Sequence, residues 1–155
     1  MAEKLGKIGR KSIWLFHFNA SGCNGCDIEF AASVTSRYDL ERFGIQLVPS
    51  PRHADVLVVT GAVNRLTRDS LKMIYDQIPE PKVVIALGSC ACSGGIFNGC
   101  YNVAGGVDKV IPVDIYIPGC PPKPDAIVEA LAKLAGILEK KKKNLKGEKN
   151  GSKKD

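Results

Sequence analysis

Two cysteines near the amino terminus, Cys23 and Cys26, have the spacing of a metal or redox site. They lie in the stretch N-A-S-G-C-N-G-C-D-I-E, among small residues that favour turns. A C-x-x-C pair is compatible with a disulfide, half of a zinc site, a redox dithiol or part of an iron–sulfur cluster. The other cysteines of the chain are needed to choose among these four.

Four further cysteines follow, and two of them, Cys90 and Cys120, come singly after apolar segments. A thioredoxin-like dithiol would leave these two unused, and structural zinc usually pairs two closely spaced cysteine knuckles. Four thiolates from one pair and two single loops favour a 4Fe–4S cluster, in which each iron takes one cysteine. Cys92 and Cys100 are predicted to be small buried hydrophobes. On composition alone, either of them can replace Cys90 as a ligand.

Alternating apolar strands and helices are expected to position these cysteines. Strands are predicted at residues 13–18, 46–48, 55–60, 82–88 and 113–117, and helices at 27–36, at 66–78 and from residue 124 onward. This alternation is typical of an α/β domain with a mostly parallel sheet. The cysteine-bearing loops then leave the carboxyl ends of strands, the edge at which such sheets build their sites.

The length and composition indicate one globular domain. The chain has 155 residues, of which 45% are hydrophobic. Its net charge of +6 belongs to the last 16 residues, because 14 basic and 14 acidic residues precede them. We therefore predict an amino-terminal extension (1–12), a folded domain (13–139) and a Lys-rich, disordered tail (140–155). A neutral body argues against nucleic-acid binding.

The sequence also narrows the compartment and the class of function. No stretch resembles a signal peptide, and no apolar run approaches the ~18 residues that span a bilayer. The chain is therefore expected to be intracellular, and soluble or peripheral. Six cysteines in that setting favour metal binding or redox chemistry over disulfides. Because no catalytic Ser–His–acid set is evident, the sequence predicts an electron-transfer module that serves another subunit's chemistry.

Four polar residues are further candidates for the site. Glu29 is either a proton-transfer or polar neighbour of the cluster, or an ordinary acid in a first helical turn. Arg52 and His53 precede a strand, and they either reach the edge of the cluster or lie on the surface. His17 lies within an apolar strand and is predicted to be a hydrogen-bonded core histidine.

The motifs together resemble the small-subunit family shared by nickel–iron hydrogenases and by the 20-kDa-type cluster subunit of respiratory complex I. The resemblance covers roughly residues 13–135. It rests on S-G-C-N-G-C-D-I-E, S-P-R-H-A-D-V-L-V-V-T-G, Y-D-Q-I-P-E-P-K, G-S-C-A-C-S-G-G and V-D-I-Y-I-P-G-C-P-P-K-P-D-A-I. It implies a flavodoxin-like, three-layer α/β sandwich with one 4Fe–4S cluster at the carboxyl ends of the strands. The implied cluster ligands are Cys23, Cys26, Cys90 and Cys120.

The spacing of the first two ligands separates the branches of this family. Complex I subunits have adjacent cysteines at these positions, whereas two residues separate Cys23 and Cys26, as in the hydrogenases. The chain is also too short for the extra cluster domain of uptake-hydrogenase small subunits. It resembles most closely the energy-converting, membrane-bound nickel–iron hydrogenases (Ech-type, group 4), which couple ferredoxin oxidation and proton reduction to ion pumping.

This resemblance implies a function and a set of partners. The chain would relay electrons through the proximal cluster to the nickel–iron site of a partner large subunit, in hydrogen evolution or uptake. A polyferredoxin-like subunit would deliver electrons from soluble ferredoxin. Integral membrane subunits would anchor the complex at the cytoplasmic side of the membrane. The chain would thus be one subunit of a ferredoxin:proton oxidoreductase, with no complete active site of its own.

Two alternative functions remain. Closely similar subunits serve formate hydrogenlyase, carbon monoxide-linked hydrogenase and complex I-like enzymes that reduce quinones or sulfur, so the chain fits such an oxidoreductase as well. The alternative of another class is a zinc-stabilised interaction module without a redox role.

Overall fold

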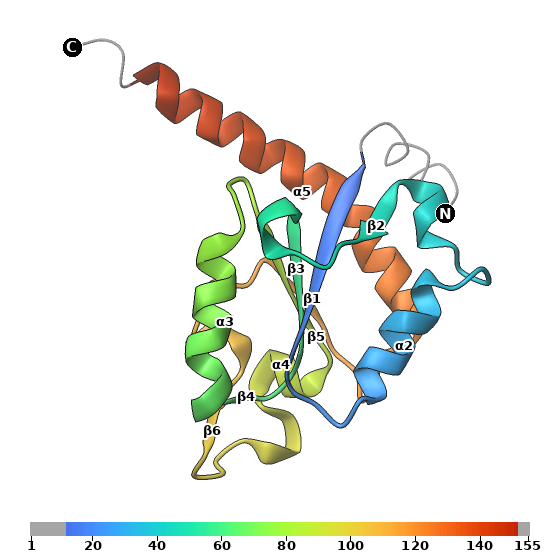
Figure 1. Ribbon diagram of the computed structural model, residues 1–155, viewed down its shortest axis with the longest axis vertical. Coiled ribbons are helices and arrows are strands. Elements are labelled where there is room, and N and C mark those ends of the chain that lie inside the picture. The colour runs from blue at the N-terminus through green and yellow to red at the C-terminus, as the bar shows by residue number, and fades with distance from the viewer. Residues whose placement is uncertain (1–11, 152–155) are drawn as a thin grey trace.

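A parallel five-stranded sheet forms the centre of the structure, a computed structural model that describes residues 12–151 (Figure 1). The strands lie in the order β2-β1-β3-β5-β7, and every neighbouring pair is parallel. Their bounds are β1 Ile13–Ser21, β2 Ile45–Leu47, β3 Val56–Gly61, β5 Val83–Leu87 and β7 Ile115–Ile117. Strands β3 and β5 are buried along their whole length, as expected for a sheet covered on both faces.

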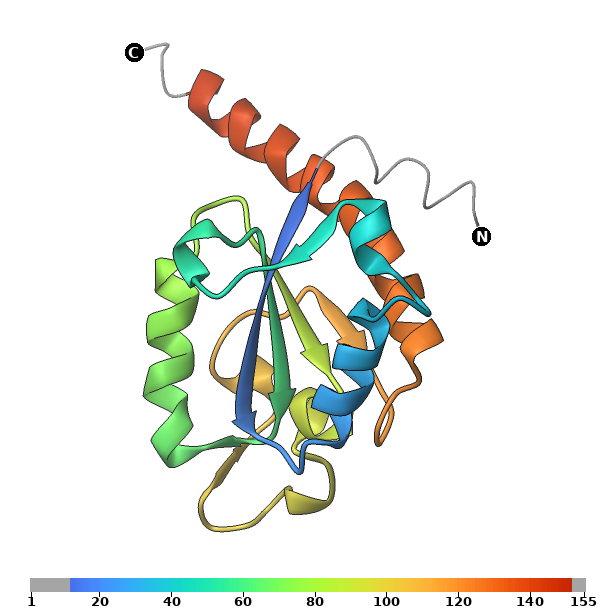
Figure 2. The same cartoon turned by 45° about the vertical axis from the view of Figure 1, so that its right-hand side comes forward.

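Helices cover both faces of this sheet (Figures 1 and 2). The first face carries α2 (Gly25–Val34) and α5 (Pro124–Gly151), and the second carries α3 (Arg65–Gln77) and the short α4 (Ser89–Ser93). Alternate residues of β3 contribute to the two cores: Val58 packs with α2 and α5, whereas Val59 packs with α3. The predicted three-layer α/β sandwich with a mostly parallel sheet is confirmed.

Helix α3 has polar contacts at both ends. At its start, Asn64 Oδ1 accepts a hydrogen bond from the Thr67 backbone N–H at 2.8 Å, and Thr67 Oγ1 accepts one from the Asn64 N–H at 3.2 Å. At its end, the ammonium group of the buried Lys82 donates to the carbonyl groups of Tyr75 at 2.8 Å and Ile78 at 3.2 Å. Backbone groups that the helix leaves unpaired are thereby satisfied.

Helix α5 is tied to the amino-terminal end of the sheet. Lys141 Nζ donates to the Lys82 carbonyl at 2.8 Å and forms an ion pair with Asp114 Oδ1 at 2.7 Å. The other oxygen of Asp114 accepts the Val84 backbone N–H at 2.9 Å, so one carboxylate joins the helix to two strand segments. Apolar side chains of the same helix, among them Ile127, complete the core on this face.

The ends of the chain bear on the predicted division into three parts. The backbone of α5 stays helical to Gly151, and this helix includes most of the segment 140–155 for which the sequence predicts a disordered tail. Residues 1–11 of the predicted extension and residues 152–155 of the predicted tail lie outside the described residues. The division into extension, domain and tail stays a prediction. Within residues 12–151, no helix is long and apolar enough to cross a membrane.

Several short elements complete the fold. An antiparallel pair, β4 (Val63–Asn64) and β6 (Val103–Gly105), lies beyond the carboxyl end of the sheet. Single 3-10 turns occur at η2 Leu40–Phe43, η3 Pro51–His53, η4 Gly95–Phe97 and η5 Val107–Lys109. The segment from α4 to β6 carries Cys90 in its first turn, so its start is part of the site described next.

Candidate metal centre

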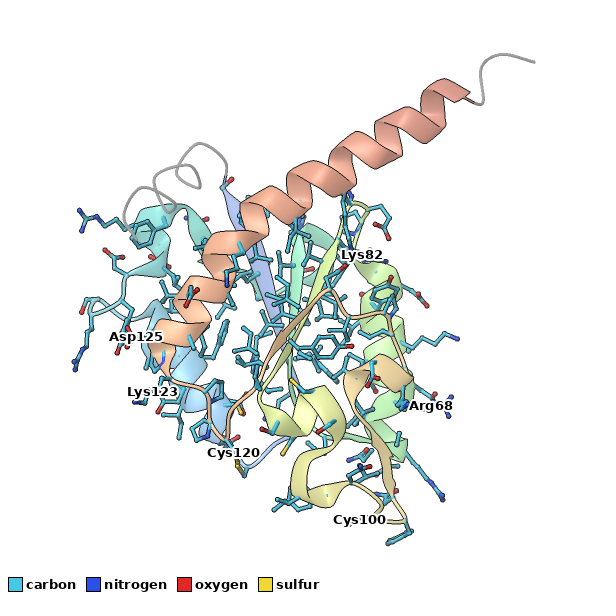
Figure 3. All side chains as sticks on the ribbon, turned by 180° about the vertical axis from the view of Figure 1, so that it is seen from behind. Arg68, Lys82, Cys100, Cys120, Lys123 and Asp125 are labelled. Carbon is cyan, nitrogen blue, oxygen red and sulfur yellow. The ribbon has the colours of Figure 1, made fainter. Side chains whose placement is uncertain are left out.

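Four cysteines from three loops lie at the carboxyl-terminal end of the sheet. Cys23 lies in the turn after β1, and Cys26 lies in the first turn of α2. Cys90 lies at the start of α4, directly after β5, and Cys120 follows β7 (Figure 3). Cys23 and Cys120 are exposed, whereas Cys26 and Cys90 are half-buried. The topology thus gathers thiols that are far apart in the sequence at the edge where α/β sheets build their sites.

Hydrogen bonds join two of these loops. The Ser89 backbone N–H donates to the Gly119 carbonyl at 2.8 Å, and the Ser89 hydroxyl donates to the same oxygen at 3.1 Å. These residues directly precede Cys90 and Cys120 in the sequence. The two single cysteines are therefore held by one hydrogen-bonded pair of turns.

Glycine lets the backbone approach two of the sulfur atoms closely. Gly88 has φ +89°, and a Cβ atom at this position would overlap the sulfur of Cys26. Gly95 has φ +55°, and a Cβ atom there would lie 3.0 Å from the sulfur of Cys90. Both positions need a residue without a side chain, because the space beside the backbone belongs to a thiol.

The four thiols influence one another electrostatically. The pKa of Cys26 is raised to about 11, first by burial and then by the negative charge of Asp27. Smaller contributions to this rise in pKa come from the other thiolates, those of Cys90, Cys23 and Cys120. The pKa of Cys90 is also raised, by burial and then by two of these thiolates. Thiolates at this edge would repel one another, so ionisation of the thiols favours a cationic occupant.

Cys92 and Cys100 stand apart from this group. The Cys92 thiol is half-buried and donates to the Ala86 carbonyl at 3.5 Å. Its pKa is raised by burial and by Asp108, with no contribution from another thiolate. Cys100 lies on an exposed loop after η4 (Figure 3), so the prediction that it is a small buried hydrophobe is wrong for this residue.

The arrangement of the four thiols bears on which metal group fits. Among residues 12–151, no group of three or more Cys, His, Asp or Glu side chains is close enough to hold a single metal ion. A 4Fe–4S cluster takes one cysteine on each of four irons, so its ligands stand around a larger core. The four thiols supply one donor for each of four irons, and glycines leave room beside the sulfurs of Cys26 and Cys90.

Arg52 and His53 lie at the other end of the sheet. They form η3, which leads into the amino-terminal end of β3. The ring of His53 lies edge-on to Trp14, the second residue of β1, with the ring centres 6.3 Å apart. Because parallel strands place their amino-terminal ends together, this turn faces away from the cysteines. Of the two positions that the sequence left open for Arg52 and His53, the structure therefore favours the surface, away from the cysteines.

The other two polar residues, Glu29 of α2 and His17 of β1, lie between or beside helix α2 and the sheet. Glu29 is a partly exposed residue of α2, and among the described residues it makes no side-chain hydrogen bond or ion pair. His17 Nε2 lies 2.8 Å from Asp27 Oδ1 and 3.1 Å from Thr60 Oγ1. The predicted hydrogen bonds of His17 are thereby confirmed, but its side chain is 24% exposed, so the prediction that it is a core histidine is wrong in that respect.

A polar network beside Cys26 was not predicted from the sequence. Asp27 accepts hydrogen bonds from the side chains of Asn19 and Thr60, each at 2.6 Å, in addition to its contact with His17. The available signal was the run of polar residues at the ends of two apolar strands. Buried polar side chains such as Thr60 need hydrogen-bond partners. The shared partner here is Asp27, which directly follows Cys26.

The fold and the site define the class of this protein: an α/β sandwich with a cysteine site at the carboxyl ends of its parallel strands. Residues 23–134, which include all four clustered cysteines, match the family described as the 20 Kd subunit of NADH ubiquinone oxidoreductase. The chain belongs to this family of oxidoreductase subunits.

Curated relatives include hydrogenase and complex I subunits. The probable membrane-bound hydrogenase subunit mbhJ of Pyrococcus furiosus is 51% identical over 141 residues, covering 91% of this chain and 82% of the relative. Formate hydrogenlyase subunit 7 of Escherichia coli is 49% identical over 90% of this chain, which spans only 54% of that relative. A subunit of the NADH-quinone oxidoreductase of Desulfovibrio desulfuricans is 47% identical, covering 87% of this chain and 70% of the relative.

Solved structures agree with these relatives. A chain of the membrane-bound sulfane sulfur reductase, an archaeal respiratory membrane complex, superposes with a TM-score of 0.73 and 40% identity over 90% of this chain and 76% of that chain. An NAD+-reducing [NiFe]-hydrogenase chain shares the fold, with a TM-score of 0.62 and 20% identity over 79% of this chain and 90% of that chain. The resemblance to the family shared by hydrogenases and complex I is confirmed.

Proposed function

We propose that this chain is an electron-transfer subunit that binds one 4Fe–4S cluster through Cys23, Cys26, Cys90 and Cys120. Its role is to relay electrons from a ferredoxin-type donor to the nickel–iron site of a partner large subunit. Hydrogen evolution or uptake by that partner would be coupled to ion translocation. The observation that carries the proposal is the convergence of four thiols from three strand ends at one edge of the sheet.

The spacing of the first cysteine pair supports the hydrogenase branch of this proposal. Two residues, Asn24 and Gly25, separate Cys23 from Cys26, a spacing that resembles the hydrogenases more than complex I. The 51% identity to a probable membrane-bound hydrogenase subunit points in the same direction.

The chain's own residues hold the cluster and give it a fixed environment. A bound 4Fe–4S cluster accepts and donates one electron at a time. The thiolates of Cys23, Cys26, Cys90 and Cys120 would hold its irons, and the positive charge of the irons would offset the burial and the repulsion that raise the pKa of Cys26. Backbone at Gly88 and Gly95 approaches the sulfurs without an intervening side chain.

Exposed apolar side chains at the same end supply a surface for the proposed large subunit. Ile28 lies two residues after Cys26, and Ile96 directly follows Gly95, which lies against the sulfur of Cys90. Ile96 is 86% exposed, and Tyr101 in the following loop is 87% exposed. A partner that covers these residues would also shield the cluster from water. A polyferredoxin-like subunit and integral membrane subunits complete the proposed complex, with this chain peripheral at the cytoplasmic side of the membrane.

A second candidate function is a cluster subunit of a complex I-like enzyme that reduces sulfur or a quinone. One observation favours it: the structural similarity to a chain of a sulfane sulfur reductase complex, at 40% identity. In that case the cysteine site and the surface would be the same, and the active site of the partner would differ.

Purification of the native complex through a tag on this chain separates the two functions. The hydrogenase proposal predicts a co-purifying large subunit that contains nickel and has two C-x-x-C pairs, one near each end. It also predicts hydrogen evolution from reduced ferredoxin by the purified complex. A stable complex without nickel that reduces sulfur or a quinone would contradict the hydrogenase proposal and support the second candidate.

A further inference from the structure

One side chain bridges the two ends of the loop that carries Cys23 and Cys26. Asn19 Oδ1 accepts a hydrogen bond from the Gly22 backbone N–H at 2.7 Å, directly before the first cysteine. Asn19 Nδ2 donates to Asp27 Oδ2 at 2.6 Å, directly after the second cysteine. A single amide group thus spans both cysteines from beneath the loop.

Asp27 is itself held from the strands. Its other carboxylate oxygen accepts the Thr60 hydroxyl at 2.6 Å and lies 2.8 Å from His17 Nε2. Thr60 is fully buried on β3, and the His17 ring stacks on Phe30 of α2, with the ring centres 5.2 Å apart. A carboxylate with three side-chain partners on two neighbouring strands has little freedom to move.

The loop between these anchors has an uncommon backbone shape. Asn24, between the two cysteines, has φ +68° and receives no stabilising hydrogen bond from its own side chain. At the start of the loop, a Cβ atom at Gly61 would lie 2.5 Å from the Gly22 nitrogen, so the chain passes in contact with β3. Such conformations persist when surrounding contacts determine them.

We propose that Asn19 and Asp27 form a clamp that fixes the positions of Cys23 and Cys26 and thereby retains the cluster. Both are positioning residues, because they act through the loop that carries the two thiols. The inference rests on the proposed function for the presence of a cluster. The clamp consists of two hydrogen bonds. The amide NH2 of Asn19 donates to the Asp27 carboxylate, and the amide oxygen of Asn19 accepts from the Gly22 N–H.

Exchange of donor and acceptor tests the clamp directly. Asn19→Asp keeps the size of the side chain and an acceptor for Gly22, but it places two carboxylates against each other. Asp27→Asn places two amide groups against each other. The double variant Asn19→Asp/Asp27→Asn restores one donor facing one acceptor, with unchanged net charge. The measurement is the rate at which the anaerobically purified full chain loses iron and sulfide to a chelator, followed by absorbance.

The clamp predicts that each single variant loses the cluster about tenfold faster than the unchanged chain, because a hydrogen bond to a charged group is disrupted. The double variant is predicted to return to the original rate. A matched control is Asn64→Asp, the same change at the start of α3. The carboxylate of an aspartate caps a helix as well as the Asn64 side chain does, so this helix keeps its cap. This control is predicted to leave the rate unchanged.

Two results would overturn the clamp: single variants that retain the cluster as long as the unchanged chain, or a double variant that recovers nothing. If a single variant fails to fold by circular dichroism, Thr60→Val removes one donor to Asp27 at nearly constant volume. Faster cluster loss in Thr60→Val would then support the clamp, and an unchanged rate would overturn it. An unchanged chain that never contains iron and sulfide would instead refute the proposed function, so the two failures are distinguishable.

Discussion

At the scale of single residues, the thiols of the site are costly to ionise together. Cys26 shows this most clearly, because burial and the surrounding negative charges raise its pKa from 9.0 to about 11. Because of this raised pKa, the folded chain without metal holds Cys26 as a neutral thiol at neutral pH. Metal binding requires the thiolate instead. Binding of iron then releases a proton from this position.

This raised pKa predicts a pH-dependent stability of the metal-free chain. Above pH 9 the unfolded chain loses the Cys26 proton while the folded chain keeps it, so the contribution of Cys26 to stability is complete below about pH 9. It is lost as the pH rises to about 11. The measurement is the free energy of unfolding in urea, under anaerobic and reducing conditions, for the unchanged chain and for Cys26→Ser.

The difference between these two chains isolates Cys26 from the lysines and tyrosines that titrate in the same range. We expect the unchanged chain to lose stability relative to Cys26→Ser as the pH rises from about 9 to about 11. Parallel stability curves over this range would show that the thiol of Cys26 is not held in its neutral form by the fold.

The sequence predicted some residues of the site and missed others for physical reasons. The cysteines could be identified by residue type and spacing. The parallel strands then bring Cys90 and Cys120 to the same edge of the sheet. Asn19 and Asp27 carry no such signature, because their importance lies in a contact that depends on the exact turn between them. The sequence left His53 open between the cluster edge and the surface, because only the direction of β3 decides that it lies at the end opposite the cysteines.

At the scale of elements, the anchoring of α5 is the contact with the clearest measurable consequence. Lys141 Nζ is bound by Asp114 and by the carbonyl of Lys82, and Lys82 lies far from Cys100 and Cys120 (Figure 3). Lys141→Met keeps the unbranched stem and the helix propensity, and it removes both polar contacts. We expect it to lower the free energy of unfolding by about 1 kcal/mol, because Lys141 is only partly exposed.

Lys133→Met is the matched control on the same helix. Lys133 forms a surface ion pair with Glu129 at 3.2 Å and is 66% exposed, so its loss is expected to change the free energy of unfolding by about 0.3 kcal/mol. Thermal and urea unfolding of both variants check the comparison. Equal effects of the two substitutions would show that the contacts of Lys141 do not anchor α5.

The strands of the main sheet and the helices α2, α3 and α5 were predictable, whereas α4, β4 and β6 were not. The apolar run of β3 and the helical spacing of α3 are visible in the sequence, and both elements lie within two residues of their predicted bounds. Helix α4 has only five residues, S-C-A-C-S, too few to show a helical period. Strands β4 and β6 are two and three residues long, and they are defined by their pairing with each other.

At the scale of the whole molecule, the two ends of the sheet have different characters. The carboxyl-terminal end carries four thiols and exposed apolar side chains such as Ile96 and Tyr101. The amino-terminal end carries Lys82 (Figure 3), Asp114 and Lys141, whose contacts join α3 and α5 to the sheet. This polarity suits a subunit that presents a cofactor to a partner at one end. The sequence alone could not show it, because it arises from the direction that every parallel strand shares.

The most direct test of the account is the iron and acid-labile sulfide content of the anaerobically purified full chain, together with its visible spectrum. We predict about four irons and four sulfides per chain and a broad visible absorption, as one 4Fe–4S cluster requires. Cys92→Ser and Cys100→Ser should keep this content, whereas Cys120→Ser should lose or convert the cluster. A colourless chain that holds one zinc and no sulfide, or a Cys92→Ser variant that loses the cluster while Cys90→Ser retains it, would contradict the account.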